Sequence, residues 1–269
     1  MSAEATTSRA GPWRAPRVRW RGITGVWWRH AVALARVWKV AVTWFLVEPG
    51  FVLIAMGRGV GSLVDTIPGH GSYSHFVTPG LVIGTGMFHA IFECAWGAFQ
   101  RIQNEQMETM LTTPTTVAEL AAGEVLWGGT RALLSTVAIG GLAIAVGWLD
   151  PWALPGVMLV SLLVGLEFGA VGLCFAAASP TLSTLTLVFT VVATPLFFFS
   201  GSFFPIDVLP PVLQPVAWAA PLTPGVELAR GFAESSLSGH HALELLYLLV
   251  LSGIFFPLAV WLLRRRLVK

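Results

Sequence analysis

The sequence RIQNEQMETMLTTPTTVAE, residues 101–119, is a polar insert between two long apolar runs. A polar stretch in this position indicates a short cytoplasmic loop between two membrane spans. Within it, residues 104–111 favour a short helix that stops near Pro114, since proline cannot continue a helix. The loop therefore sets where two neighbouring spans begin and end.

This short helix has one apolar face. Met107, Met110 and Leu111 have the spacing 0, 3 and 4 that places side chains together, whereas Glu105 and Glu108 fall elsewhere on the helix. A helix of this kind below the bilayer is typical of a docking element. We predict that the apolar face contacts a partner and that the two glutamates set orientation.

The composition excludes a soluble domain. Of 269 residues, 55% are hydrophobic and 11% charged, and the mean hydropathy is +0.74. A helix needs about 20 apolar residues to cross a bilayer. Six stretches approach that length, which predicts an all-α integral membrane protein with six transmembrane helices: 40–62, 77–99, 121–148, 152–178, 181–200 and 241–263.

Basic residues predict the orientation. Of the 16 lysines and arginines, eight lie in residues 1–39 and four in the tail 264–269. Because cytoplasmic flanks are rich in these residues, both termini are expected in the cytoplasm, with an even number of spans between. The basic residues then flank a membrane rather than line a groove, so the net charge of +2 does not indicate a nucleic-acid partner.

The N-terminal 39 residues are expected to form a basic segment followed by an amphipathic helix in the inner interface plane. A cytoplasmic extension of the first span is the alternative. Arg29 and Arg36 lie opposite one apolar face, which comprises Ile23, Trp27, His30, Leu34 and Trp38.

Four ionisable residues fall within predicted spans: Glu48, His89, Glu93 and Glu167. Such groups normally face a protein interior or a cavity, so all four are candidates for the lining of a path. His89 and Glu93 are four residues apart and could form a proton relay or a metal pair. A polar contact between helices is the favoured interpretation, because no third ligand stands nearby, and no metal site is predicted.

The stretch FFFSGSFFPIDVLPPVLQPVAWAAPLTPGVELARG, residues 197–231, is apolar but broken by six prolines. It predicts short helices that re-enter the outer leaflet at residues 205–235, between spans 5 and 6. Its five phenylalanines have two interpretations: their rings seal a closed path, or they simply face lipid. These residues are Phe197, Phe198, Phe199, Phe203 and Phe204.

These motifs together resemble the transmembrane subunit of type-2 ABC exporters, and most closely the permeases of nodulation lipo-oligosaccharide exporters. The resemblance extends over nearly the whole chain after residue 22. It rests on Glu48-Pro49, SHFVTPGLV (74–82), Phe92-Glu93, METMLTTPTTVAELAAGE (107–124) and SGSFFPIDVLPPVLQPVAWAAPLTPGVELARG (200–231).

The resemblance implies a half-transporter in a bacterial cytoplasmic membrane, dimeric with a second copy and bound to two ATPase subunits. Residues 101–119 would be the coupling loop, and the segment 205–235 the outer helices. The cargo would be a lipid-linked saccharide, with a daunorubicin-type drug as the alternative. ATP and Mg²⁺ would bind the partner, because neither Lys39 nor Lys269 stands in a GxxxxGK[ST] loop.

Two other classes fit less well. A membrane-embedded enzyme could use His70, His75, His89 and Glu93, but their spacing matches no zinc-hydrolase pattern such as HExxH. A proton-coupled secondary transporter would favour internal repeats, and the two halves of the chain show none. We therefore expect a permease subunit without an enzymatic activity of its own.

Overall fold

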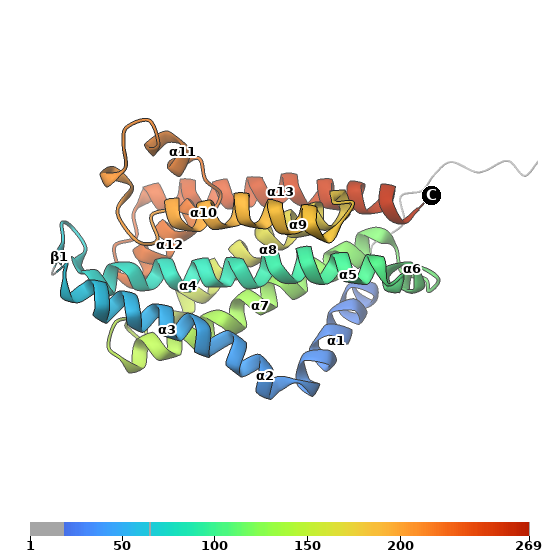
Figure 1. Ribbon diagram of the computed structural model, residues 1–269, viewed down its shortest axis with the longest axis horizontal. Helices are drawn as coiled ribbons and strands as arrows, with labels where there is room; N and C mark the ends of the chain where they lie inside the picture. Colours follow the sequence, from blue (N-terminus) through green and yellow to red (C-terminus); the bar gives the residue numbers. More distant parts are fainter. Residues whose placement is uncertain (1–18, 65, 269) are drawn as a thin grey trace, which may run out of the picture.

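The computed structural model describes residues 19–64 and 66–268 as one elongated helical bundle (Figure 1). Six of its helical segments are long and apolar enough to cross a membrane. The prediction of an all-α membrane protein with six spans is confirmed. Residues 1–18 of the predicted basic N-terminal segment, and Lys269, lie outside the described residues.

The spans overlap the six predicted stretches. Span 1 (Trp38–Ser62) consists of α2 (Trp38–Val42), η1 (Thr43–Val47), α3 (Glu48–Ile54), η2 (Ala55–Gly59) and η3 (Val60–Ser62). Span 2 (Tyr73–Gln103) consists of α4 (Tyr73–Phe92), η4 (Glu93–Gly97) and α5 (Ala98–Gln103). Spans 3, 4 and 6 are α7 (Val117–Ala145), α8 (Leu154–Ala178) and α13 (Gly239–Leu267), and span 5 (Leu182–Phe199) joins α9 (Leu182–Val188), η5 (Phe189–Ala193) and α10 (Thr194–Phe199).

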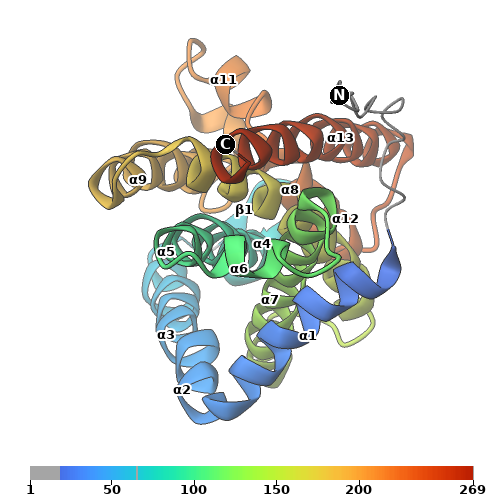
Figure 2. The same ribbon diagram turned by 90° about the vertical axis from the view of Figure 1, so that its right-hand side faces the viewer.

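We call one end of the bundle the basic end. It carries α1 (Trp20–Arg36), α6 (Gln106–Leu111) and the last turn of α13 with Arg264, Arg265 and Arg266. Helix α1 runs obliquely across this end and packs on α7 (Figures 1 and 2). The predicted tail at 264–269 is therefore largely a continuation of span 6, since α13 extends to Leu267.

The opposite end carries the short β1 (Thr66–Ile67) and β2 (Gly71–Ser72), which pair antiparallel. It also carries the proline-broken segment, which forms η6 (Ile206–Val208), α11 (Gln214–Trp218) and α12 (Thr223–Ala233). Prolines in the first turns of α11 and α12 mark where each helix begins, because a proline starts a helix readily but cannot continue one.

Spans 2, 3 and 4 form the core of the bundle, and α12 and α13 pack against it. Spans 3 and 4 approach closely at small residues: a Cβ on Gly165 would lie 2.6 Å from the Cβ of Ala132 and 2.9 Å from the Cα of Gly129. Within the apolar 18-residue stretches of spans 1, 5 and 6, the buried share is only 28%, 17% and 11%. These three helices therefore leave large apolar faces at the periphery.

Candidate functional site

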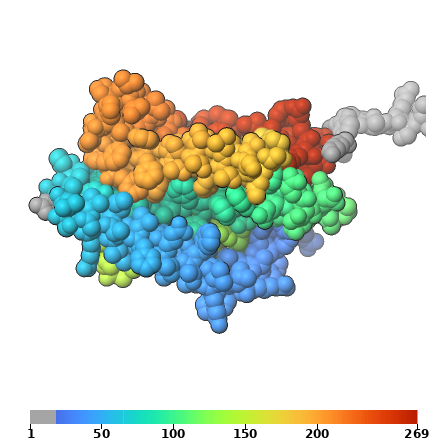
Figure 3. All heavy atoms as spheres, in the orientation of Figure 1, coloured from blue at the N-terminus to red at the C-terminus, as the bar shows by residue number. Residues whose placement is uncertain are grey.

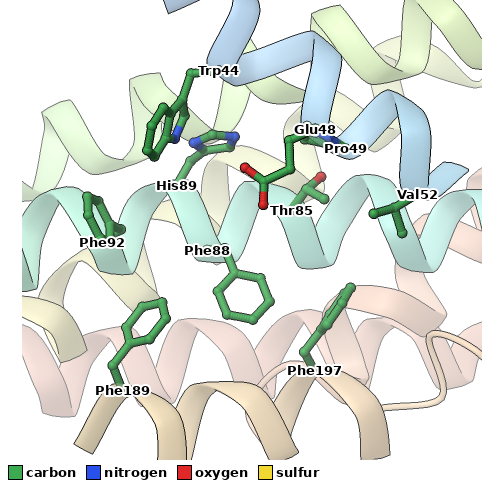
Figure 4. Close-up of a pocket in the computed structure, with 10 residues that line it drawn as sticks. All are labelled: Trp44, Glu48, Pro49, Val52, Thr85, Phe88, His89, Phe92, Phe189 and Phe197. Carbon is green, nitrogen blue, oxygen red and sulfur yellow. The ribbon is translucent and has the colours of Figure 1, made fainter. Parts of the chain in front are cut away.

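A pocket of about 330 Å³ lies where spans 1, 2 and 5 meet (Figure 4). In the space-filling view, span 2 is recessed between spans 1 and 5 (Figure 3). Glu48 and Trp44 reach the pocket from span 1, and Thr85 and His89 from span 2 (Figure 4). The remaining lining is apolar: Pro49, Val52, Phe88, Phe92, Phe189 and Phe197.

A second pocket of about 430 Å³ lies on the same helix nearer the basic end. It shares Phe92 with the first pocket and is otherwise lined by Glu93, Trp96, Gly97, Gln100, Arg101, Asn104 and Gln106. The lining residues of span 2 recur every three or four positions, as on one face of a helix: Thr85, Phe88, His89, Phe92, Trp96 and Gln100. This span 2 stripe connects the polar basic end with the apolar interior.

Aromatic rings dominate the middle of the stripe. Phe92 stacks on Trp96 with ring centroids 5.6 Å apart, and Phe88 meets Phe197 edge to face at 5.1 Å. Phe189 of span 5 approaches both Phe88 and Phe92. Such a lining offers apolar ring faces with a few hydrogen-bonding groups, which is typical of pockets for amphipathic ligands.

The predicted intramembrane polar residues separate into two sets. Glu48, His89 and Glu93 line the two pockets. Glu167 of α8 is fully buried inside the bundle, lines neither of the two pockets on span 2, and has no hydrogen-bond partner among the described residues for either carboxylate oxygen. Glu167 thus lies apart from the two pockets, and its place on a path stays a prediction.

His89 and Glu93 do not act as a pair. The ring of His89 lies 4.6 Å from that of Phe45, whereas Glu93 forms ion pairs with Arg101 at 2.9 Å and with Arg131 of α7 at 3.3 Å. Glu93 thus makes the polar contact between helices that was the favoured interpretation. Among residues 19–64 and 66–268, no group of three His, Cys, Asp or Glu side chains is placed to hold a metal ion.

The ion pairs of Glu93 belong to a larger cluster at the basic end. Glu124 of α7 is fully buried and accepts a hydrogen bond of 2.6 Å from Arg101. From α1, His30 lies 3.1 Å and Arg29 3.6 Å from the other oxygen of Glu124. We call this set the basic-end cluster: Arg29, His30, Glu93, Arg101, Glu124 and Arg131.

The cluster corrects one part of the α1 prediction. Arg29 does not lie away from the protein with Arg36 but reaches inward to Glu124. Partial burial lowers the pKa of the Arg29 guanidinium from its ordinary value, and the charge of Glu124 opposes that change. The cluster ties α1, span 2 and span 3 together directly beside the predicted coupling loop.

The predicted coupling loop contains α6, as expected, but its apolar face turns inward. Met107 is fully buried in the hydrophobic core at the basic end, and Met110 and Leu111 pack against that core. Met107 is therefore covered by this chain rather than open to a partner. The pattern of one apolar face cannot distinguish the two, because burial within the chain and burial against a partner need the same spacing.

The polar side of the loop remains accessible. Glu105 is exposed and adopts a positive φ of 55°, and Pro114 is exposed as well. The carbonyl oxygen of Pro114 accepts a hydrogen bond from the Arg19 side chain. Glu108 is only partly exposed, and one of its carboxylate oxygens is buried without a hydrogen-bond partner in the described chain.

Three of the five phenylalanines at 197–204 form a ring cluster. Phe203 lies 4.9 Å from Phe197 and 5.1 Å from Phe198 between ring centroids. Phe204 packs against the same core, whereas Phe199 lines a separate groove between span 5 and α11. The ring cluster closes the end of the first pocket through Phe197, but its role as a gate stays a prediction.

Arg230 fixes the segment beyond these rings. Its side chain is almost fully buried, donates 2.9 Å to the carbonyl oxygen of Gly201, pairs with Glu227 and lies 4.1 Å over the ring of Phe76. In the sequence, Arg230 is the single basic residue of the stretch 197–231. Its burial could not be anticipated, because one arginine in a proline-rich stretch has no periodic signal.

The family model described as ABC-2 type transporter matches residues 22–232 of the chain. The chain is 32% identical to nodulation protein J of Rhizobium leguminosarum bv. trifolii, over 91% of this chain and 93% of that protein. Identity to nodulation protein J of Rhizobium meliloti (strain 1021) is 30%, over 94% and 96%. The inner membrane transport permease YadH of Escherichia coli (strain K12) is 25% identical over 79% and 82%.

Proposed function

The chain belongs to the ABC-2 type transporter family, and from this premise we propose that it is the membrane subunit of an ATP-driven exporter of a lipid-linked saccharide. It is a multi-pass protein of the bacterial inner membrane. The matches to nodulation proteins J are stronger than that to YadH and favour a saccharide over a daunorubicin-type drug.

The span 2 stripe is the observation that carries the proposal. It offers polar groups at the basic end and aromatic rings in the middle, and Phe197 of span 5 lines the apolar far end of the first pocket. Ring faces suit acyl chains and the apolar faces of sugars, while Glu48, His89 and Thr85 can hydrogen-bond hydroxyl groups. An amphipathic cargo could therefore move along one surface while both its polar and its apolar parts keep matching contacts.

ATP hydrolysis belongs in this proposal to a separate subunit, which binds ATP and Mg²⁺. Two copies of the permease and two ATPases make up the assembly, with both termini and the loop at 101–119 on the cytoplasmic side. This placement puts the basic end in the cytoplasm, where arginines are enriched. The exposed residues of the loop, including Glu105, would contact the ATPase.

The test is export from cells, or transport into inverted vesicles, of a lipid-linked saccharide in the presence of the ATPase subunit. Phe92→Ala and Trp96→Ala should each reduce transport severalfold at normal membrane levels, because both remove ring faces from the stripe. Trp152→Ala is the matched control, since Trp152 is 93% exposed and lines neither pocket. Transport that needs a proton gradient but no ATP would overturn the proposal.

A further inference from the structure

We propose that a small pocket beside the start of span 6 binds the ammonium head group of an aminophospholipid. The pocket has a volume of about 160 Å³ and lies between α11, α12 and the first turns of α13, at the end opposite the basic end (Figure 1). It shares no residue with the two pockets on span 2. Its lining consists of Trp218, Thr223, Pro224, His240, Leu243, Glu244 and Tyr247.

Glu244 supplies the negative charge. Its side chain is more than nine-tenths buried, and its Oε2 has no hydrogen-bond partner among the described residues. Its Oε1 lies 3.5 Å from Nε2 of His240, whose own side chain is 68% exposed at the mouth. A buried carboxylate oxygen without a donor is costly, so a cationic donor that enters the pocket would be favoured.

The neighbouring charges do not provide that donor. Glu227 and Arg230 of α12 are close enough to act electrostatically on Glu244. Arg230, however, already pairs with Glu227 and donates to the carbonyl oxygen of Gly201. Together Glu227 and Arg230 carry no net charge, so α12 leaves the charge of Glu244 unbalanced, and within the pocket lining only His240, when protonated, opposes it.

The walls offer ring faces rather than further acceptors. The hydroxyl of Tyr247 donates 2.8 Å to the carbonyl oxygen of Ala219, and that of Thr223 donates 2.5 Å to Ala217. The rings of Tyr247 and Trp218 therefore line the pocket, and the hydroxyl of Tyr247 is already bonded to Ala219. Aromatic faces beside a carboxylate attract an ammonium group by cation–π and charge–charge interactions together.

The position of the pocket identifies a lipid as the source of that ammonium. Glu244 lies about 8 Å along α13 from its first residue, which is the depth of head groups beside a spanning helix. Leu243 beside the pocket, and Leu246 and Val250 deeper along α13, are 62%, 55% and 50% exposed at helical spacing and form an apolar track for an acyl chain. In the proposed orientation this lipid belongs to the outer leaflet.

Native mass spectrometry of the purified full chain in detergent tests the site with dioleoylphosphatidylethanolamine. Its N-acetylated form, which has lost the ammonium charge, is the comparison lipid. We expect phosphatidylethanolamine to bind at about tenfold lower concentration, and Glu244→Gln to abolish that preference, since a charge-assisted contact is lost. Asp207→Asn is the matched control, because Asp207 is exposed at the same end outside the pocket.

Trp218→Leu gives a second variant, and it should weaken phosphatidylethanolamine binding without unfolding the protein, because Trp218 is 47% exposed. Equal binding of the two lipids to the unmodified protein would overturn the proposal. If soluble ethanolamine competes for the site while the two lipids bind equally well, the assignment of a lipid as the ligand would be overturned. These measurements need neither ATPase nor transport, so they stand apart from the test of the proposed function.

Discussion

At the scale of single residues, Glu124 is the centre of the basic-end cluster. It is fully buried and contacts Arg101, His30 and Arg29. Removing one partner of a buried ion pair leaves the other uncompensated, at a cost of about 3 to 5 kcal/mol. We predict that Glu124→Gln lowers the free energy of unfolding by this amount in detergent. Glu105→Gln is the control, and equal stability of the two variants would contradict the prediction.

Glu167 allows the opposite experiment. Its buried carboxylate lacks a hydrogen-bond partner in the described chain, and such a group costs about 1 to 3 kcal/mol. Glu167→Leu should therefore raise the free energy of unfolding and leave export unchanged. Glu48→Leu should reduce export, because Glu48 lines the first pocket. Loss of export in Glu167→Leu at normal membrane levels would place Glu167 in the path after all.

The sequence predicted which residues are polar within the membrane but not all of their partners. The sequence predicts Glu93 as a contact between helices but carries no signal for its partner Arg131 or for Glu124. Their pairing depends on how far span 2 is rotated against span 3, and a π-helical turn at Glu93–Gly97 changes that rotation. A helical period of 3.6 residues therefore could not predict these contacts.

At the scale of elements, we expect different residues in and beside α6 to serve stability and coupling to the ATPase. Met107 is buried in the core at the basic end, so Met107→Ala should cost about 2 to 5 kcal/mol in unfolding free energy. Glu105→Arg should leave stability unchanged but reduce retention of the ATPase subunit in a pull-down, since Glu105 is exposed on the loop. The coupling role would fall if Glu105→Arg and Glu108→Arg both retain the ATPase and export normally.

The ring cluster at the end of the first pocket gives a second prediction for an element. Phe203 contacts both Phe197 and Phe198, so Phe203→Ala should open a gap and raise leakage of cargo without nucleotide. Phe199→Ala is the control, because Phe199 faces the separate groove beside α11. A change in stability alone, with no leakage, would assign the rings to packing.

The helix ends show what local sequence could still have provided. Span 3 begins at Val117, four residues before the predicted start, because Thr116 and Glu119 form a capping box. That TVAE motif is visible in the sequence, but hydropathy alone passes over it. The breaks within the segment 205–235, by contrast, follow directly from its prolines, since each of α11 and α12 carries one in its first turn.

At the scale of the whole molecule, the exposed faces of spans 1, 5 and 6 distinguish alternatives that the sequence could not. Hydropathy predicts a spanning helix equally well whether it faces lipid, a second copy or the interior. The structure leaves all three spans largely unburied within one chain. Of these three spans, only spans 1 and 5 border the first pocket, which is open between them, so a partner on that face would enclose the pocket.

We therefore predict that two copies meet through spans 1 and 5, while span 6 faces lipid. Single cysteines at Phe51 and Leu187, which are 70% and 63% exposed, probe the predicted interface. Leu246→Cys on span 6, at 55% exposure, is the control. A bifunctional thiol reagent applied to membranes should link Phe51→Cys or Leu187→Cys into dimers and leave Leu246→Cys monomeric. The native cysteines, Cys94 and Cys174, are buried and should react slowly.

The same arrangement predicts the stoichiometry of the assembly. One chain supplies one wall of the first pocket, so two permeases are needed to enclose a path, and each has its own loop at 101–119 for an ATPase. The native mass of the solubilised complex should correspond to two permeases and two ATPases. Cross-linking through Leu246→Cys alone would place span 6 at the interface and leave the first pocket facing lipid. A single permease with a single ATPase would mean that the path is completed by this chain alone.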